Sequence, residues 1–164
     1  MNAKDKINYI SDWIKSYADS NGFKSLVIGI SGGIDSAVTS TLSAKTGLKT
    51  IVANMPILEH KVTNDRGLSH ITWLKKNFKN VEDLKIDLSV VFENFKTALN
   101  SNDSEHGYAN SQARIRMTTL YQIAASNNGI VVGTGNKVED FGIGFYTKYG
   151  DGGVDISPIA DCLK

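Results

Sequence analysis

Cysteine is nearly absent from this chain of 164 residues, which has a single one, Cys162. One cysteine cannot form an internal disulfide, and it cannot supply the thiolates of a cysteine-based metal cluster, so both are excluded. Low cysteine content is typical of proteins from a reducing compartment. We expect Cys162 to be a small buried apolar residue, as free cysteines commonly are.

A strong charge of either sign is also lacking, because 18 Lys and Arg oppose 17 Asp and Glu, giving a formal net charge of +1. That balance provides no overall electrostatic attraction to nucleic acid or to a membrane surface. Residues 1–16 carry scattered charges and no continuous apolar segment, so we expect no signal peptide or membrane anchor there. The expected protein is cytoplasmic and binds neither nucleic acid nor membrane.

The two commonest phosphate-binding signatures are missing as well. A P-loop ends in Gly-Lys-Ser/Thr, and the dinucleotide fingerprint has glycines at its first, third and sixth positions. Residues 26–40, LVIGISGGIDSAVTS, match neither, yet they place a small-residue turn between an apolar run and a segment with helical spacing. Gly29, Gly32 and Gly33 let the backbone approach a ligand closely. The N–H groups of such a turn, followed by a helix start, form an anion-binding nest.

Asp35 is the unusual member of this turn, because a carboxylate in a phosphate cradle repels the phosphate. It becomes reasonable if Mg²⁺ lies between them, since Mg²⁺ is commonly held by one or two carboxylates together with phosphate oxygens. Ser31 and Ser36 add hydroxyl donors. The alternative is that Asp35 is simply a helix N-cap and the glycines form a tight turn.

Along the rest of the chain, short apolar runs alternate with amphipathic segments. The predicted helices are 4–20, 35–46, 64–79, 90–99 and 110–126, and the predicted strands are 25–30, 50–55, 84–88 and 129–133, with a polar loop at 100–107. This alternation predicts one α/β domain over 1–164, a doubly wound, mainly parallel sheet with helices on both faces. Ligands of such sheets bind beyond the carboxyl ends of the strands, near the point where the winding reverses.

SGGIDS (31–36) resembles the SGGxDS loop with which N-type ATP pyrophosphatases hold the pyrophosphate of ATP. ANSQARIRM (109–117), VVGTGNKVED (131–140) and GFYTKYGDGGVDISPIADCLK (144–164) are similar, in order and approximate spacing, to segments of NAD synthetases. The resemblance covers nearly all of the chain and is weakest between 57 and 108. No part of it corresponds to the nitrilase-type amidase domain of glutamine-using relatives, which points to the ammonia-dependent form. It implies a Rossmann-like fold of the adenine nucleotide alpha hydrolase type.

The resemblance implies an amide-forming ligase. ATP adenylates the nicotinate carboxylate of deamido-NAD and releases pyrophosphate; ammonia then displaces AMP to give NAD. Mg²⁺ is the implied cofactor, ATP the co-substrate, and the implied assembly is a homodimer with the deamido-NAD site at its interface. Family members usually continue beyond the position of Lys164, so we expect the chain to be C-terminally incomplete.

The resemblance also implies the site residues. For ATP they are Gly29, Ile30, Ser31, Gly32, Gly33, Ile34, Asp35, Ser36, Met55, Thr134 and Lys164. For deamido-NAD they are Arg114, Lys148 and Asp155, and for Mg²⁺ they are Asp35 and Glu139. Asp35 and Lys164 are the implied catalytic residues.

Several of these assignments have alternatives. Met55 is equally well explained as a core methionine, and Arg114 as an exposed helix charge. This chain has one residue more than its relatives between GTGNK and FYTKYGDGG, so counting back from the second block selects Asp140 instead of Glu139. We favour Glu139, because the segment attached to the strand end is the more rigid one.

The glycine-rich segment 142–153 is either an ordinary hairpin-like loop or a substrate-closing element, which we expect to be disordered without ligand. The histidines, His60, His70 and His106, have no nucleophile beside them in the sequence, and we expect them on the solvated surface. The apolar side chains of Ile115, Leu120 and Ile123 belong either to a dimer interface or to the core.

Two other functions stay open. Another N-type ATP pyrophosphatase, such as a tRNA-modifying adenylating enzyme, is disfavoured by the single cysteine and the charge of +1. A non-catalytic module that binds an adenine nucleotide explains SGGIDS but leaves Glu139, Lys148 and Asp155 without roles.

Overall fold

The computed structural model describes residues 1–58, 61–100 and 104–163. Within them a parallel sheet of four strands has the order β3-β2-β1-β4. The strands are β1 (Ser25–Gly29), β2 (Lys49–Asn54), β3 (Val81–Lys85) and β4 (Gly129–Val131). Val27 in β1 pairs with Ile51 of β2 on one side and with Val131 of β4 on the other.

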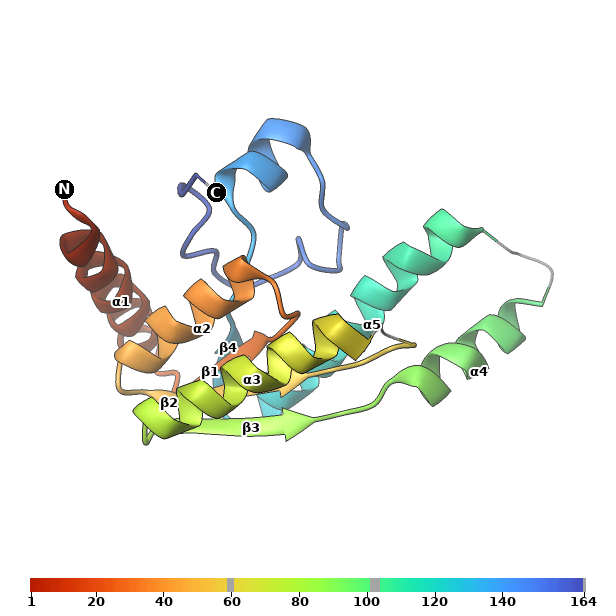
Figure 1. Ribbon diagram of the computed structural model, residues 1–164, viewed down its shortest axis with the longest axis horizontal. Helices are drawn as coiled ribbons and strands as arrows, with labels where there is room; N and C mark the ends of the chain where they lie inside the picture. The colour runs from red at the N-terminus through yellow and green to blue at the C-terminus, as the bar shows by residue number, and fades with distance from the viewer. Residues whose placement is uncertain (59–60, 101–103, 164) are drawn as a thin grey trace.

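Helices cover both faces of this sheet (Figure 1). On one face, α1 (Ala3–Ser20), α2 (Ile34–Lys45) and α3 (Lys61–Asn77) share an apolar core with the side chains of Leu26, Ile28 and Val52. On the other face, α4 (Ser89–Leu99) and α5 (Glu105–Ser126) pack against Val27, Ile51 and Val131. The predicted doubly wound α/β sheet is therefore confirmed.

The course of the chain defines where the winding reverses. From β1 it moves outward through α2, β2, α3 and β3, and then returns across the opposite face through α4 and α5 to β4, beside β1. The reversal lies between β1 and β4, and a ligand site is expected at their carboxyl ends. The segment after β4, drawn in blue in Figure 1, arches over the N-terminal end of α2 at this edge.

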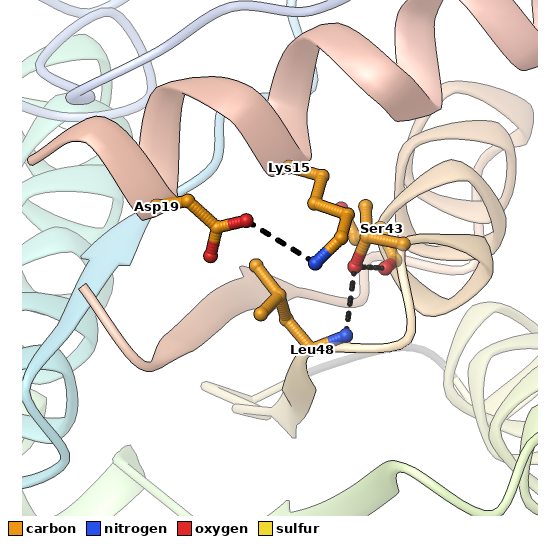
Figure 2. A network of polar contacts seen from close by, with 5 residues as sticks. Lys15, Asp19, Ser43 and Leu48 are labelled. Atoms are coloured by element: carbon orange, nitrogen blue, oxygen red, sulfur yellow. Dashed lines mark hydrogen bonds and ion pairs between the residues drawn. The ribbon is translucent and has the colours of Figure 1, made fainter. Parts of the chain in front are cut away.

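The C-terminal end of α2 is closed by a hydrogen-bonded turn into β2 (Figure 2). The Thr46 hydroxyl donates to the Ser43 carbonyl at 2.6 Å and accepts from the Leu48 N–H at 3.1 Å. The ion pair between Lys15 and Asp19 of α1 lies nearby in the same view. This turn therefore fixes the C-terminal end of α2, which is the end away from the glycine-rich turn at residues 31–36.

Most predicted elements are present, but the strand predicted at 84–88 is wrong by three residues. β3 is an edge strand and buries only its first residue, Val81, so its own sequence carries little apolar signal. The apolar Ile86 and Leu88, which prompted the prediction, lie beyond the strand and pack against the core under α4 and α5. The apolar pattern therefore corresponds to the segment that follows β3 and not to the strand itself.

The helix predicted from 110 begins at Glu105, because the Ser104 hydroxyl caps it by accepting from the Gly107 N–H at 3.2 Å. A short π-helix, η1 (Val138–Ile143), follows β4 and has no counterpart among the predicted elements. None of the helices in the described ranges is long and apolar enough to cross a membrane.

Candidate active site

The turn between β1 and α2 has the geometry of an anion-binding nest. Gly32 has a φ of +82°, a conformation that residues with a Cβ rarely adopt. Gly33 occupies the N-cap position of α2, and its residue type offers no side-chain acceptor to the first helical N–H groups. The N-terminus of α2 therefore points its backbone donors and the positive end of its dipole toward the edge of the sheet where a ligand is expected.

The two serines of the turn have different roles. Ser31 is exposed, whereas Ser36 is only 2% exposed. The Ser36 hydroxyl donates to the Gly33 carbonyl at 3.0 Å and lies 3.1 Å from the Ser31 hydroxyl, while the Ser31 N–H contacts it at 3.3 Å. Ser36 therefore shapes the turn, and Ser31 is the serine whose hydroxyl is accessible to a ligand.

A cavity of about 260 Å³ opens beside this turn, at the carboxyl ends of β1 and β4. The predicted ATP residues that line it are Gly29, Ile30, Ser31, Met55 and Thr134. The other predicted members of the turn, from Gly32 to Ser36, are not among its lining residues. Met55 fits both of its interpretations, because it packs in the core under α5 and also lines the cavity.

Sequence reasoning missed Arg116, which lines the same cavity from α5. Its Nε donates to the Met55 carbonyl at 3.0 Å and so joins the helix to the end of β2. The prediction selected Arg114, two residues earlier in ANSQARIRM, but residues two apart on a helix face different directions. Asp151 is a second unpredicted charged residue in the cavity wall.

Several carboxylates lie near one another beside the turn. Burial raises the pKa of Asp140 above its ordinary value, and the negative charges of Asp151, Glu139 and Asp35 raise it further. The Asp140 carboxylate occupies the space that a Cβ on Gly135 would fill. Within the described ranges, no three His, Cys, Asp or Glu side chains are grouped so that they could hold a metal ion.

The two candidate Mg²⁺ residues, Glu139 and Asp140, both lie in the π-helix η1. A π-helix has more residues per turn than an α-helix, and single π-turns are frequent at functional sites. The buried Asn136 anchors its start, since its Oδ1 accepts from the N–H groups of Val138 at 3.0 Å and Glu139 at 3.1 Å. The Phe145 N–H bonds back to the Glu139 carbonyl at 2.8 Å and closes the C-terminal end of η1.

The predicted deamido-NAD residues lie along one side of α5. The Arg114 Nε donates to the Lys148 carbonyl at 3.0 Å. Two helical turns later, the Tyr121 hydroxyl donates to Asp155 Oδ1 at 3.1 Å, while Asp155 Oδ2 accepts from the Val131 N–H at 2.7 Å. Burial raises the pKa of Tyr121 to about 12, and the hydrogen bond and charge of Asp155 contribute to the rise.

A groove lies on α5 beside Tyr121. It is lined by Met117, Thr118, Tyr121, Gln122, Tyr149 and Gly153. Met117 also lines the cavity beside the phosphate-type turn, so the two depressions adjoin across α5.

The glycine-rich loop is packed against α5. The Thr147 hydroxyl donates to Asn110 Oδ1 at 2.6 Å, and the Thr147 carbonyl accepts from the Gly150 N–H at 2.9 Å. A Cβ on Gly150 would lie 2.9 Å from the Ala113 Cβ, and one on Gly152 would lie 2.5 Å from the Tyr146 ring. These glycines are therefore required for close packing, and the disorder expected without ligand remains a prediction.

The histidine expectations have three outcomes. His106 is exposed, as expected, and His60 lies outside the described residues, as does Lys164. The expectation for His70 is wrong, because its ring is half-buried and its Nε2 lies 2.9 Å from the Ser40 hydroxyl. Burial lowers the pKa of His70 below 6.5, although a hydrogen bond to the Ala37 backbone opposes that shift.

The structure also shows where the apolar side chains of α5 lie. Leu120 and Ile123 are buried in the core, and Ile115 is half-buried against the same cluster. Cys162 packs against the core on the opposite face but is only half-buried, so the expected burial is partial.

Comparisons with known proteins agree with this geometry. The sequence model of the family described as NAD synthase matches residues 6–164. The NH(3)-dependent NAD(+) synthetases of Mesoplasma florum and Methanosarcina mazei are 35% and 38% identical to this chain, and the alignments cover all of it. The chain spans 66% and 64% of the length of these relatives.

Two solved structures share the fold over the whole chain. An NMN synthetase from Francisella tularensis is 33% identical with a TM-score of 0.92, and the match covers 67% of that protein. An NH3-dependent NAD synthetase from Campylobacter jejuni, in complex with the nitrate ion, is 30% identical with a TM-score of 0.89, and the match covers 69% of it. With the turn, the cavity and the α5 groove in place, these matches show that the chain belongs to the NAD synthase family.

Proposed function

We propose that this chain carries the synthetase site for ATP-dependent amidation of deamido-NAD with ammonia, forming NAD, AMP and pyrophosphate. The observation that carries the proposal is the adjacency of two depressions that share Met117. One is lined by predicted ATP residues at the point where the winding reverses. The other lies along α5 and has Tyr121, the hydrogen-bond partner of Asp155, and Tyr149, the neighbour of Lys148, in its wall.

The proposed chemistry follows from the weakness of a carboxylate as an acyl electrophile. Adenylation turns one carboxylate oxygen into part of a good leaving group, AMP, and pyrophosphate leaves in the same step. The N–H groups in the first turn of α2, with the helix dipole, would stabilise the charge that develops on that pyrophosphate. Thr134, across the cavity, is the proposed ATP contact from the end of β4.

We propose Asp35 and Glu139 as the residues that hold Mg²⁺, with Asp140 as the alternative to Glu139. The donor set consists of oxygens only, and burial followed by the negative charges of Asp151, Glu139 and Asp35 raises the pKa of Asp140; both features fit a divalent cation. When bound, Mg²⁺ would supply charge neutralisation at the phosphates. Lys164 is proposed from the family resemblance alone to face those phosphates.

Arg114, Lys148 and Asp155 are the proposed contacts to deamido-NAD. A homodimer in the cytoplasm completes the proposal, with the groove along α5 near the partner. The dimer is supported by the position of the groove at the protein surface, where the rings of Tyr121 and Tyr149 are exposed and accessible to a partner subunit.

Pyrophosphate release from ATP tests the proposal. The chain is incubated with ATP, Mg²⁺ and ammonia, with or without deamido-NAD. Release that requires deamido-NAD, and that is abolished in Asp35→Asn, is the expected result. Nucleotide binding without release would favour the non-catalytic module, and release with no acceptor dependence would point to another ATP pyrophosphatase.

A second acceptor follows from the likeness to the Francisella tularensis NMN synthetase, with its TM-score of 0.92. Nicotinate mononucleotide carries the same carboxylate and would undergo the same amidation. The ratio of kcat/KM for the two acceptors, measured in the same assay, decides between them, and we expect it to favour deamido-NAD.

A further inference from the structure

We propose that His70 is a positioning residue for the phosphate-binding turn and acts through Ser40 on the first turn of α2. The inference deepens the proposed function, since it rests on the turn from Ser31 to Ser36 being the ATP loop. His70 lies on α3, a helix to which the proposed chemistry assigns no residue.

The first link is between His70 and Ser40. The His70 Nε2 lies 2.9 Å from the Ser40 hydroxyl, which also contacts the Ser36 carbonyl at 2.7 Å. A serine hydroxyl has one proton to donate and two lone pairs to accept with. In the tautomer that carries its proton on Nε2, His70 donates to Ser40, and Ser40 donates to the Ser36 carbonyl.

The second link runs from Ser40 into the turn. The carbonyl that Ser40 contacts belongs to Ser36, the residue whose hydroxyl joins Gly33 and Ser31. His70 is also hydrogen-bonded to the backbone of Ala37, the next residue of α2. The histidine thus supports the segment of α2 that gives the turn its shape.

The same face of α3 lies close to the turn. Gly67 lies one helical turn before His70, and a Cβ placed on it would be 3.6 Å from the Gly32 nitrogen and 3.5 Å from the Ile30 side chain. The ring of His70 is held by Trp73, with the ring centroids 5.8 Å apart and an interplanar angle of 18°. α3 itself is fixed by Leu74, which is fully buried in the core.

A serine and a histidine at this distance also resemble a nucleophile and its general base. Ser40 is 0% exposed, so no substrate reaches its hydroxyl. The pair therefore acts on the protein's own backbone, which leaves positioning as its role.

Four variants test the proposal. His70→Leu removes the donor, His70→Gln restores an N–H donor at similar reach, Ser40→Ala removes the bridge, and His106→Leu is the control at an exposed histidine. Amide hydrogen exchange over residues 31–37 is measured in each variant, together with Mg-ATP affinity and, with deamido-NAD, KM and kcat. Exchange over β1 and β2 verifies that each variant is folded.

We expect His70→Leu to accelerate exchange over 31–37 and to weaken Mg-ATP binding about fivefold to tenfold, the effect of one lost hydrogen bond. In His70→Leu, KM for ATP should rise by a larger factor than kcat falls. His70→Gln and His106→Leu should stay near wild type in all of these measurements. The double variant His70→Leu with Ser40→Ala should bind Mg-ATP no more weakly than either single variant. Unchanged exchange over 31–37 in a folded His70→Leu variant, or no rescue by His70→Gln, would overturn the proposal. If the wild-type chain binds no ATP, the proposed function fails, and the exchange measurement still decides the role of His70.

Discussion

Asn136 gives the sharpest stability prediction, because one buried side chain holds the turn that carries Glu139 and Asp140. It is 1% exposed, and its Oδ1 accepts hydrogen bonds from two consecutive backbone N–H groups at the start of η1. Asn136→Ala removes both acceptor contacts. A lost helix-capping side chain costs about 0.5–2 kcal/mol, and each N–H left unpaired adds to that cost.

We therefore expect Asn136→Ala to lower the free energy of unfolding by about 2 kcal/mol, which for a domain of this size is a fall in Tm of roughly 4–8 °C. Differential scanning calorimetry and urea unfolding measure the loss. The Mg²⁺ concentration needed for half-maximal activity should also rise, because the turn that carries the proposed ligand loosens. Asn136→Ser, which keeps a capping oxygen, should recover a large part of both effects.

The reasoning would be refuted if Asn136→Ala left stability within about 0.5 kcal/mol of wild type, the range of an ordinary surface substitution. It would also be refuted if Asn136→Ser were as damaging as Asn136→Ala, since the capping oxygen would then have no part in the effect.

Three further predictions concern neighbouring features. Glu139→Gln should abolish Mg²⁺-dependent turnover while Asp140→Asn has a mild effect; titration of both variants with Mg²⁺ checks this, and the reverse outcome would assign the metal to Asp140. Gly150→Ala should destabilise the protein by about 1–3 kcal/mol in a thermal melt, because its Cβ would lie 2.9 Å from that of Ala113; an unchanged Tm would mean that the loop moves away without cost. Burial lowers the pKa of folded His70 below its ordinary 6.5, so the unfolded chain binds more protons and stability should fall as the pH drops below 6.5, less steeply in His70→Gln; equal slopes for the two proteins would argue against this origin.

The central part of the fold was predictable because its strands are buried on both faces. β1 and β2 appear in the sequence as apolar runs, and Gly47 after α2 has the positive φ that its residue type allows. β3 was misplaced because it lies at the edge of the sheet and exposes most of its side chains. Local sequence patterns indicate which side chains are buried, and an edge strand with few buried side chains therefore gives a weak pattern.

The site was partly predictable for a similar reason. The Gly-rich turn is continuous in sequence, so its residues could be named together. The contact of His70 with Ser40 joins residues 30 positions apart on two helices, and only their packing brings them together. Arg116 and Asp151 likewise reach the cavity through the packing of α5 and of the loop against it.

The central claim is that the nicotinate carboxylate is adenylated at this site, and transfer of oxygen-18 tests it most directly. Deamido-NAD labelled with oxygen-18 in its carboxylate is converted with ATP, Mg²⁺ and ammonia, and the AMP is examined by mass spectrometry. We predict that each AMP carries one labelled oxygen, because the bond that ammonia breaks joins the acyl carbon to that oxygen. AMP without label, or no AMP at all, would contradict the account.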